Sequence, residues 1–269
     1  MSKSLLTLAA GLIACLAGVA LTAQDRVDMA MVARIRAEAS QRSKVLETFN
    51  YITNVVGARP TGSRAHKQAA DYVRAKLEGW GLTNAHLEPF QFGRGWELEK
   101  FSLEMTAPRY FPMFGYPLAW TPSTKGVLAG TPIYLADKTE TEITALGEKL
   151  RGAIVLASPP QTVFTLTDRL QPADTDQLVR IGGPEPPTER QATSVMPANA
   201  MTTLLQKFGA GAILRPGTEL HGTVTVGGSP QTPKNSVPTV IVMAEHYNMI
   251  VRMMQTGVTP QLRLDLRTA

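Results

Sequence analysis

Apolar residues recur every three or four positions through the first third of the chain, which is the spacing that gives a helix one apolar face. The pattern predicts three helices, over residues 27–42, 44–56 and 64–80. Ser43 and Ser63 stand where a hydroxyl can accept hydrogen bonds from the free amides of a first helical turn. Gly57 and Gly81 follow the last apolar positions and are placed to end the second and third helices.

Beyond residue 90 the apolar positions alternate with polar ones or form short runs, as they do in strands. Phe90 and Phe92 predict a strand that ends at residues 93–96, GRGW, and residues 101–105 alternate as a half-buried strand should. Leucines at 262, 264 and 266 alternate with charged residues and predict a last strand. Short runs predict further strands at 133–135, 153–157, 212–214 and 237–243, and helices at 140–149, 198–208 and 245–255.

Two stretches break this regular pattern. Residues 108–122 hold four prolines and many aromatic residues, which indicates a rigid, packed crossing between domains. Residues 158–197 show little periodicity, and loops of that length are usually functional or mobile. With 269 residues, 43% of them hydrophobic, the chain has material for two domains or for one large domain with an insert.

Charge changes this picture little. The 27 Lys and Arg outnumber the 22 Asp and Glu, for a net charge of +5, but the basic residues are dispersed. This distribution favours a soluble basic surface over a nucleic-acid groove.

The N-terminus is typical of an export signal. Lys3 precedes an uncharged run over residues 5–21, and small residues follow, so cleavage is expected after Ala23. A retained membrane anchor is one alternative, although the run is short and rich in Ala and Gly. A lipoprotein signal at Cys15 is another, although the seven residues directly after the cysteine, 16–22, are all uncharged. Because Cys15 is the only cysteine, the mature body has no disulfide, thiolate metal site or cysteine nucleophile.

The four histidines are the first candidates for metal binding or acid–base work. No two lie within five residues of each other, so the sequence has no helical His pair and no H-x-D motif. His66 and His246 fall near the starts of predicted helices and are interpreted as surface residues. His86, on a predicted strand, and His221, in a glycine-rich loop, could each supply one ligand.

Other catalytic motifs are missing from the sequence. Residues 227–230, GGSP, lack the second glycine of a nucleophile elbow, and no phosphate-binding loop or dinucleotide fingerprint occurs. Glu97 and Glu99 are two apart on a strand and are interpreted as a solvated face. The residues alone therefore indicate no catalytic or metal-binding position, and substrate-binding residues stay unassigned.

Four stretches in a fixed order carry a family resemblance. The first is VGARPTGSRAHKQAADYVRAKLEGWGL, residues 56–82, and the second is FGRGWELEKFSLEMTAPRYFPMFGYPLAWTP, residues 92–122. The third is LRGAIVLAS, residues 150–158, and the fourth is VPTVIVMAEHYNMIVRMMQTGVTPQLRLDLR, residues 237–267. The first two are similar to secreted zinc exopeptidases of the carboxypeptidase Q and bacterial aminopeptidase type. The last two resemble the start and the end of a protease-associated domain inserted in such enzymes.

The resemblance implies an α/β fold. It would be a partial zinc-exopeptidase domain, made of N-terminal helices and a few strands, with an inserted strand-rich α+β protease-associated domain. The expected boundaries are a signal peptide at 1–23, the first part of the peptidase domain at 24–114, the insert at 115–258 and a return strand at 259–269. An insert needs its two connections close together, so we expect the flanking strands at 101–105 and 262–266 to pair.

The resemblance also implies a function. In the family the zinc ligands and the catalytic glutamate lie C-terminal to the insert, beginning with an H-x-D motif that this chain lacks. We therefore expect the N-terminal portion of an exported zinc-dependent exopeptidase. Its full-length relatives use two zinc ions and act on peptides, whereas this chain is expected to bind no zinc and to supply no catalytic residue. Whether the chain belongs to an enzyme depends on that parent protein, and amino- or carboxypeptidase preference is not indicated.

The remaining expectations concern partners. No nucleic-acid partner is expected, membrane contact would come only from a retained signal or a lipidated Cys15, and the oligomeric state is not indicated. A hypothesis of a different class is a complete, non-catalytic exported protein that binds peptides or another protein. The turn over residues 57–63 is interpreted as a structural turn and helix cap rather than an anion site, with Arg59 available to an acidic partner.

Overall fold

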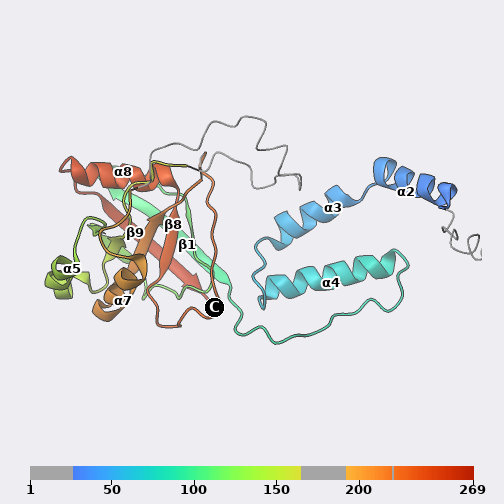
Figure 1. Cartoon of the computed structure of the whole chain (residues 1–269), viewed down its shortest axis with the longest axis horizontal. Coiled ribbons are helices and arrows are strands. Elements are labelled where there is room, and N and C mark those ends of the chain that lie inside the picture. The colour runs from blue at the N-terminus through green and yellow to red at the C-terminus, as the bar shows by residue number, and fades with distance from the viewer. Residues whose placement is uncertain (1–26, 165–191, 220) are drawn as a thin grey trace, which may run out of the picture. The chain divides into compact units, whose positions relative to one another are not determined.

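The computed structural model describes residues 27–164, 192–219 and 221–269 (Figure 1). The chain divides into two units, residues 1–57 and 58–269. The predicted signal peptide and the centre of the long loop lie outside the described residues. Within the described ranges, no helix has the length and apolar character needed to span a bilayer. Each unit is described by itself.

Helix α2 of the first unit spans Met29–Gln41, close to the predicted range. Asp28 is its N-cap, and its carboxylate accepts hydrogen bonds from the backbone amides of Ala30 (2.9 Å) and Met31 (3.0 Å). These bonds satisfy amides that have no partner within the helix. The helix buries none of its residues, and Met29, Met31 and Ile35 of its apolar positions are exposed.

The second predicted helix forms, but it is not uniform. Helix α3 (Val45–Asn50) continues directly into η1 (Tyr51–Val56), a stretch of π-helix. Gly57 ends it as predicted, with a φ of +75° that a residue with a side chain rarely adopts. The predicted Ser43 cap is wrong. Lys44 occupies the N-cap position without a side-chain bond, and the Ser43 hydroxyl accepts only from the amide of Val45, at 3.4 Å.

The second unit opens with helix α4 (Arg64–Gly79), which confirms the predicted helix and its cap. The Ser63 hydroxyl accepts from the backbone amide of His66 at 3.0 Å. Gly81 follows the helix with a φ of +90°, as its predicted role as terminator requires. Of the apolar face of the helix, only Ala69 is buried.

The strand predicted at residues 90–96 does not form. Residues 83–97 hold no strand, and Phe90 is exposed. A strand exists only where a neighbour pairs with it. Here the polar groups of Arg94 and Trp96 bond instead to loops far along the chain, as described below.

One sheet of the second unit is antiparallel and has the order β2-β1-β9-β4. Its strands are β1 (Leu98–Ala107), β2 (Phe111–Pro112), β4 (Leu128–Gly130) and β9 (Gln261–Thr268). In β1 and β9, Phe101 lies opposite Leu266, Leu103 opposite Leu264 and Met105 opposite Leu262. The predicted pairing of these distant strands is therefore confirmed.

The two faces of this sheet differ. The leucines of β9 are buried, whereas the opposite face carries ion pairs between β1 and β9. Lys100 pairs with Asp265 at 2.5 Å and Glu104 with Arg263 at 2.9 Å. This alternation of leucine and charge along the sequence is what predicted the strand, because successive side chains of a strand point to opposite faces.

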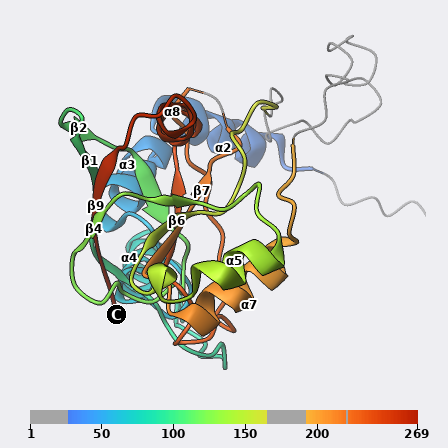
Figure 2. The ribbon, with the colours of Figure 1, turned by 90° about the vertical axis from the view of Figure 1, so that its left-hand side faces the viewer.

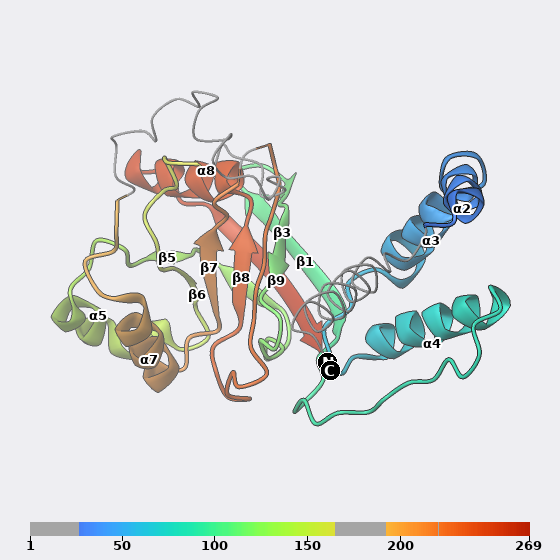
Figure 3. The same ribbon diagram turned by 45° about the vertical axis from the view of Figure 1, so that its right-hand side comes forward.

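The other sheet has the order β3-β8-β7-β6-β5, and β5 to β8 are parallel (Figure 3). Its strands are β3 (Gly115–Pro117), β5 (Ile133–Tyr134), β6 (Ile154–Leu156), β7 (Ala212–Pro216) and β8 (Thr239–Val242). The associated helices are α5 (Glu140–Leu146), η2 (Gly147–Leu150), α7 (Ala198–Phe208) and α8 (Ala244–Gln255). All four predicted strands and all three predicted helices of this region are present, which gives the expected mixed α/β fold.

Two apolar clusters hold this unit together. One lies between the two sheets and α8, and it joins β1 and β9 to the parallel strands. The other lies on the opposite face of the parallel sheet under α5, η2 and α7, and Figure 2 shows α5 and α7 side by side. Parallel strands buried on both faces read as continuous apolar runs, which is why AIVLA at residues 153–157 was recognisable as a strand.

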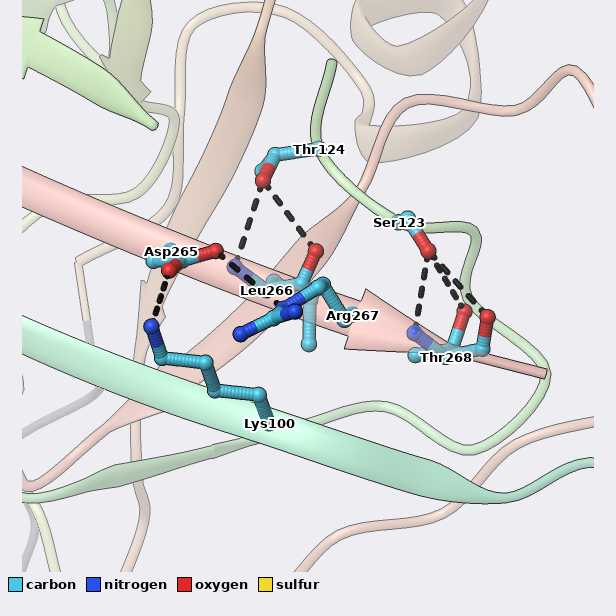
Figure 4. A network of polar contacts seen from close by, with 7 residues as sticks. All are labelled: Lys100, Ser123, Thr124, Asp265, Leu266, Arg267 and Thr268. Carbon is cyan, nitrogen blue, oxygen red and sulfur yellow. Dashed lines mark hydrogen bonds and ion pairs between the residues drawn. The ribbon is translucent and has the colours of Figure 1, made fainter. Parts of the chain in front are cut away.

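A polar network fixes the end of β9 beyond β4 (Figure 4). The Thr124 hydroxyl lies 3.2 Å from both the amide and the carbonyl of Leu266. The Ser123 hydroxyl accepts from the amide of Thr268 at 2.9 Å. Two side chains thus satisfy the backbone groups that a longer β4 would otherwise pair.

Candidate functional site

The start of α4 was the first place where the sequence raised the question of an anion site. The structure puts a carboxylate of the chain itself there. Glu97 accepts a hydrogen bond from the backbone amide of Arg64, and its Oε2 lies 2.5 Å from the Arg64 guanidinium. The hydrogen bond from Arg64 lowers the pKa of Glu97.

This contact settles two interpretations. A negative group near a helix N-terminus is favoured by the helix dipole, and Glu97 supplies it from 33 residues away. The interpretation of Glu97 as part of a solvated face is therefore wrong, whereas Glu99 is exposed as expected. The turn and cap before α4 serve the fold, because the chain fills the position that a bound anion would take.

The GRGW stretch at residues 93–96 is a junction between loops. Arg94 donates from Nη2 to the carbonyls of Trp120 (3.0 Å) and Thr232 (2.6 Å), and the indole of Trp120 donates back to the carbonyl of Arg94 (2.9 Å). The buried indole of Trp96 donates to the carbonyl of Thr121 at 2.9 Å. The polar atoms of this motif are occupied by backbone carbonyls, so the motif organises the fold.

The glycines of this junction are there because two backbones meet. A Cβ on Gly95 would lie 2.3 Å from the carbonyl oxygen of Gly62, which itself has a φ of +83°. No side chain fits at that distance. The sequence reasoning missed this role because the two glycines are far apart in the chain.

The four histidines do not meet one another. His66 lies half-buried in the first turn of α4, and His221 is exposed in a turn with a φ of +60°. His86 is exposed in a loop rather than on the predicted strand, with Nε2 3.3 Å from Glu88. Within residues 27–164, 192–219 and 221–269, no three His, Cys, Asp or Glu side chains gather as a metal site would require.

His246 was expected at the surface, and this expectation is wrong. Only 8% of the residue is exposed, because the segment around β2 covers the start of α8. Its Nδ1 accepts from the backbone amide of Phe114 at 3.1 Å, and its ring lies against those of Phe111 and Phe114. Burial lowers the pKa of His246, and Glu245 opposes that effect. Because its Nδ1 accepts this hydrogen bond, the imidazole holds the segment around β2 against α8.

A small hollow lies beside this contact between His246 and Phe114. It has a volume of about 260 Å³ and is lined by residues of β1 and of the segment from Tyr110 to Gly115. Tyr110 and Phe114, which line it, are 67% and 65% exposed. Drug-sized ligand pockets run from about 300 to 1,000 Å³, so this hollow would admit a single side chain rather than a whole ligand.

The next residues of α8 hold the base of the long loop. The Tyr247 hydroxyl donates to the carbonyl of Ser158 (2.5 Å) and accepts from its amide (3.1 Å), and burial raises the pKa of this tyrosine. The Asn248 side chain pairs in the same way with the amide and carbonyl of Gln161, at 2.8 and 2.7 Å. The described start of the loop is therefore tied to α8 by four hydrogen bonds.

Stability should fall as the pH is lowered from about 8 to about 5, and His246 should cause part of the loss. Because its pKa in the folded chain is below the ordinary value of 6.5, the unfolded chain takes up a proton first as the pH passes 6.5. Carboxylates with lowered pKa values, such as Glu97 and Asp265, reduce stability only below about pH 4.5, which lies outside the range from pH 8 to 5. Urea unfolding across the range measures the effect.

The matched variants are His246→Asn and His86→Gln. Asparagine keeps an amide group near the position of Nδ1 but does not titrate, so the pH dependence between 8 and 5 should flatten. His86→Gln changes an exposed loop residue and should leave the dependence as in the wild type. Parallel curves for the wild type and His246→Asn would show that the buried imidazole is not responsible.

Comparisons with known proteins agree with this fold. No protein-family model matches the chain. Bovine carboxypeptidase Q is 23% identical over 238 residues, which cover 87% of this chain and 44% of that protein. The crystal structure of a peptidase M28 precursor from Shewanella amazonensis SB2B matches with a TM-score of 0.52 at 16% identity, covering 89% of this chain and 50% of that one.

The chain thus spans about half the length of the proteins that it matches. At 16% identity the second likeness concerns the fold alone. In that respect, the helices and two sheets described here correspond to part of an M28 peptidase fold.

Proposed function

We propose that this chain forms the N-terminal, non-catalytic part of an exported zinc-dependent exopeptidase. The observation that carries the proposal is the likeness to carboxypeptidase Q, which runs over 238 residues but covers less than half of that protein. The zinc ions and the residues that bind them would belong to other parts of the protein, because the described donors of this chain do not gather into a site. Peptides would be the substrates of the whole protein.

Within this proposal, residues 115–258 would be an inserted protease-associated domain between the peptidase segments 24–114 and 259–269. The pairing of β1 with β9 supports it, since the two strands bracket that stretch and bring its ends together. The core shared by β1, β9 and the parallel sheet would hold the insert firmly against its host. Export would depend on the signal peptide at residues 1–23.

A second function is favoured by a specific feature of the antiparallel sheet. Strand β2 pairs with β1 only at Glu104 and Met105, so the outer edge of β1 toward Leu98 has no strand partner among the described residues. An extended peptide can add to such an edge, and exposed Tyr110 and Phe114 stand beside it. The chain would then be a non-catalytic peptide-binding protein.

The native protein decides between the two. Purified from its source, it should be much larger than the 29.1 kDa of this chain, should contain zinc and should release terminal residues from peptides. Recombinant residues 24–269 should retain no stoichiometric zinc after dialysis and should not hydrolyse the same peptides.

Two results would contradict the proposal. A native protein of about the mass of this chain, without zinc or peptidase activity, would favour the peptide-binding function. Zinc that stays bound to recombinant residues 24–269, with hydrolysis of peptides, would show that the chain holds a complete site of its own.

A further inference from the structure

Strands β6, β7 and β8 run parallel, with their amino ends at the same end of the sheet (Figure 3). A second and larger hollow is lined by residues at these amino ends. Its volume is about 470 Å³, within the range of small-molecule sites. Four loop segments form its walls: residues 122–128, 151–152, 206–211 and 234–238. Ligands of open α/β sheets usually bind at the carboxyl ends of the strands, whereas this hollow lies at their amino ends.

The charged residues that line the hollow are all basic. Lys125, Arg151 and Lys234 line the hollow, and no Asp or Glu among the described residues does. In the part of the chain that the structure describes, neither lysine forms an ion pair, and both are exposed at the rim. The residues come from segments far apart in the sequence, so folding concentrates positive charge that composition alone showed as dispersed.

Two features oppose this charge only weakly. Arg151 already pairs with Glu148 through Nε (2.5 Å) and Nη2 (2.9 Å), but both side chains are exposed, and such pairs contribute little. The C-terminus of α7, which ends at Gly209 on the wall, carries a partial negative charge. One carbonyl there, that of Gly209, is already taken by the amide of Gly152 at 2.9 Å.

An unsatisfied hydroxyl is the second, independent observation. Ser236 lines the hollow, and its buried Oγ has no hydrogen-bond partner among the described residues. A buried polar atom without a partner is costly, and a water, an ion or a ligand can supply the partner that the chain does not. Gln206 and Asn235 add amide groups to the same wall, and amide N–H groups can donate to an oxyanion.

From this combination we propose that the hollow binds a small polyanion, with two or more carboxylate or phosphate groups. Lys125 and Lys234 provide charge at the rim, Arg151 exchanges Glu148 for the ligand, and the Ser236 hydroxyl donates a hydrogen bond that is otherwise unmade. Carboxylate and phosphate share the chemistry that this lining recognises. The proposal does not depend on peptidase activity, so its test and that of the proposed function are separate.

Two anionic probes distinguish the possible sources, and isothermal titration at low salt measures them. The carboxylate probe is N-acetyl-Glu-Glu-amide, the phosphate probe is inorganic pyrophosphate, and N-acetyl-Gln-Gln-amide is the neutral control. At least one anionic probe should bind residues 24–269 with a Kd below about 1 mM, and the neutral peptide should not bind. In a nitrogen-15 NMR titration, the amide signals of Gly152, Gly211 and Asn235 should shift.

The charge of the site is tested by a matched pair of double variants. Lys125→Gln with Lys234→Gln should weaken binding about tenfold. Lys67→Gln with Lys138→Gln removes the same net charge from surface positions away from the hollow and should change the Kd less than about twofold. Because all four lysines lie at the surface, these variants should fold as the wild type does.

Ser236→Ala tests the hydroxyl with two readouts of opposite sign. Removing an unpartnered buried hydroxyl should leave the Tm unchanged or raise it, because nothing bonded is lost. The same change should weaken binding of the probe by a few-fold, because its partner is removed. A serine with a purely structural role would lower the Tm and leave binding unchanged.

Three results would overturn the proposal. The first is no binding of either anionic probe at about 1 mM. The second is equal weakening by both double variants, which would indicate attraction by net charge alone. The third is binding that Ser236→Ala leaves unchanged together with a lowered Tm. If only one probe binds as expected, it identifies the ligand as a carboxylate or as a phosphate.

Discussion

Leu264→Ala should remove about 2–5 kcal/mol of stability, the cost typical of a leucine truncated in a packed core. Leu264 is 0% exposed at the centre of β9, opposite Leu103 on one neighbour and Leu128 on the other. It also belongs to the apolar cluster that includes the parallel strands. Its loss should therefore destabilise both sheets together, as urea unfolding followed by circular dichroism would show.

Leu82→Ala is the matched control, because Leu82 is 51% exposed and the same atoms are removed there. It should change stability by less than about 0.5 kcal/mol. Separate transitions for the two sheets in Leu264→Ala, or a loss no larger than that of the control, would contradict a single shared core.

Gly95→Ala should cost about 1–3 kcal/mol, because an added methyl group would overlap the carbonyl oxygen of Gly62. The turn before α4 and the GRGW junction would have to separate, and the bond between the Trp96 indole and Thr121 would be disturbed. Thermal unfolding gives the cost, and near-ultraviolet circular dichroism reports on the tryptophan environment.

Gly79→Ala is the control for this substitution. A Cβ on Gly79 would meet no atom within 4 Å, and the residue lies at the end of a helix, where alanine is favoured. The variant should be as stable as the wild type or slightly more so. Equal behaviour of the two glycine variants would mean that the backbones do not approach as closely at Gly95 as described.

The fold was predictable where local pattern and tertiary structure agree. Helix α7 begins after Pro197 and ends at Gly209, with a φ of +71°, so its predicted bounds were correct. The pairing of β1 and β9 was predicted from period-two patterns in both strands together with the insert that the family resemblance implies, because an insert needs its two ends close together. In such a strand, the alternation of apolar and polar residues shows directly which side chains face the core.

The sequence did not show what depends on a distant partner. Phe90 and Phe92 have strand-forming side chains, but no strand of the described part of the chain pairs with them, and the expected strand is absent. His246 lies on α8 as predicted, yet its burial is set by Phe111 and Phe114, more than 130 positions away. The same holds for the candidate sites, because Arg64 and Glu97, or Lys125 and Lys234, become neighbours or face one hollow only after folding.

The pairing of β1 with the last strand imposes an order on how the chain can be made. About 150 residues separate Ala107 from Gln261, and a ribosome adds roughly 5–20 residues per second, so β1 would wait roughly 8–30 s for its partner. During that interval Leu103 and Met105 have no strand to cover them, while the parallel strands can already associate with α5 and α7. The nascent chain therefore leaves an apolar strand uncovered for seconds, and its yield on expression should depend on chaperones that bind such strands.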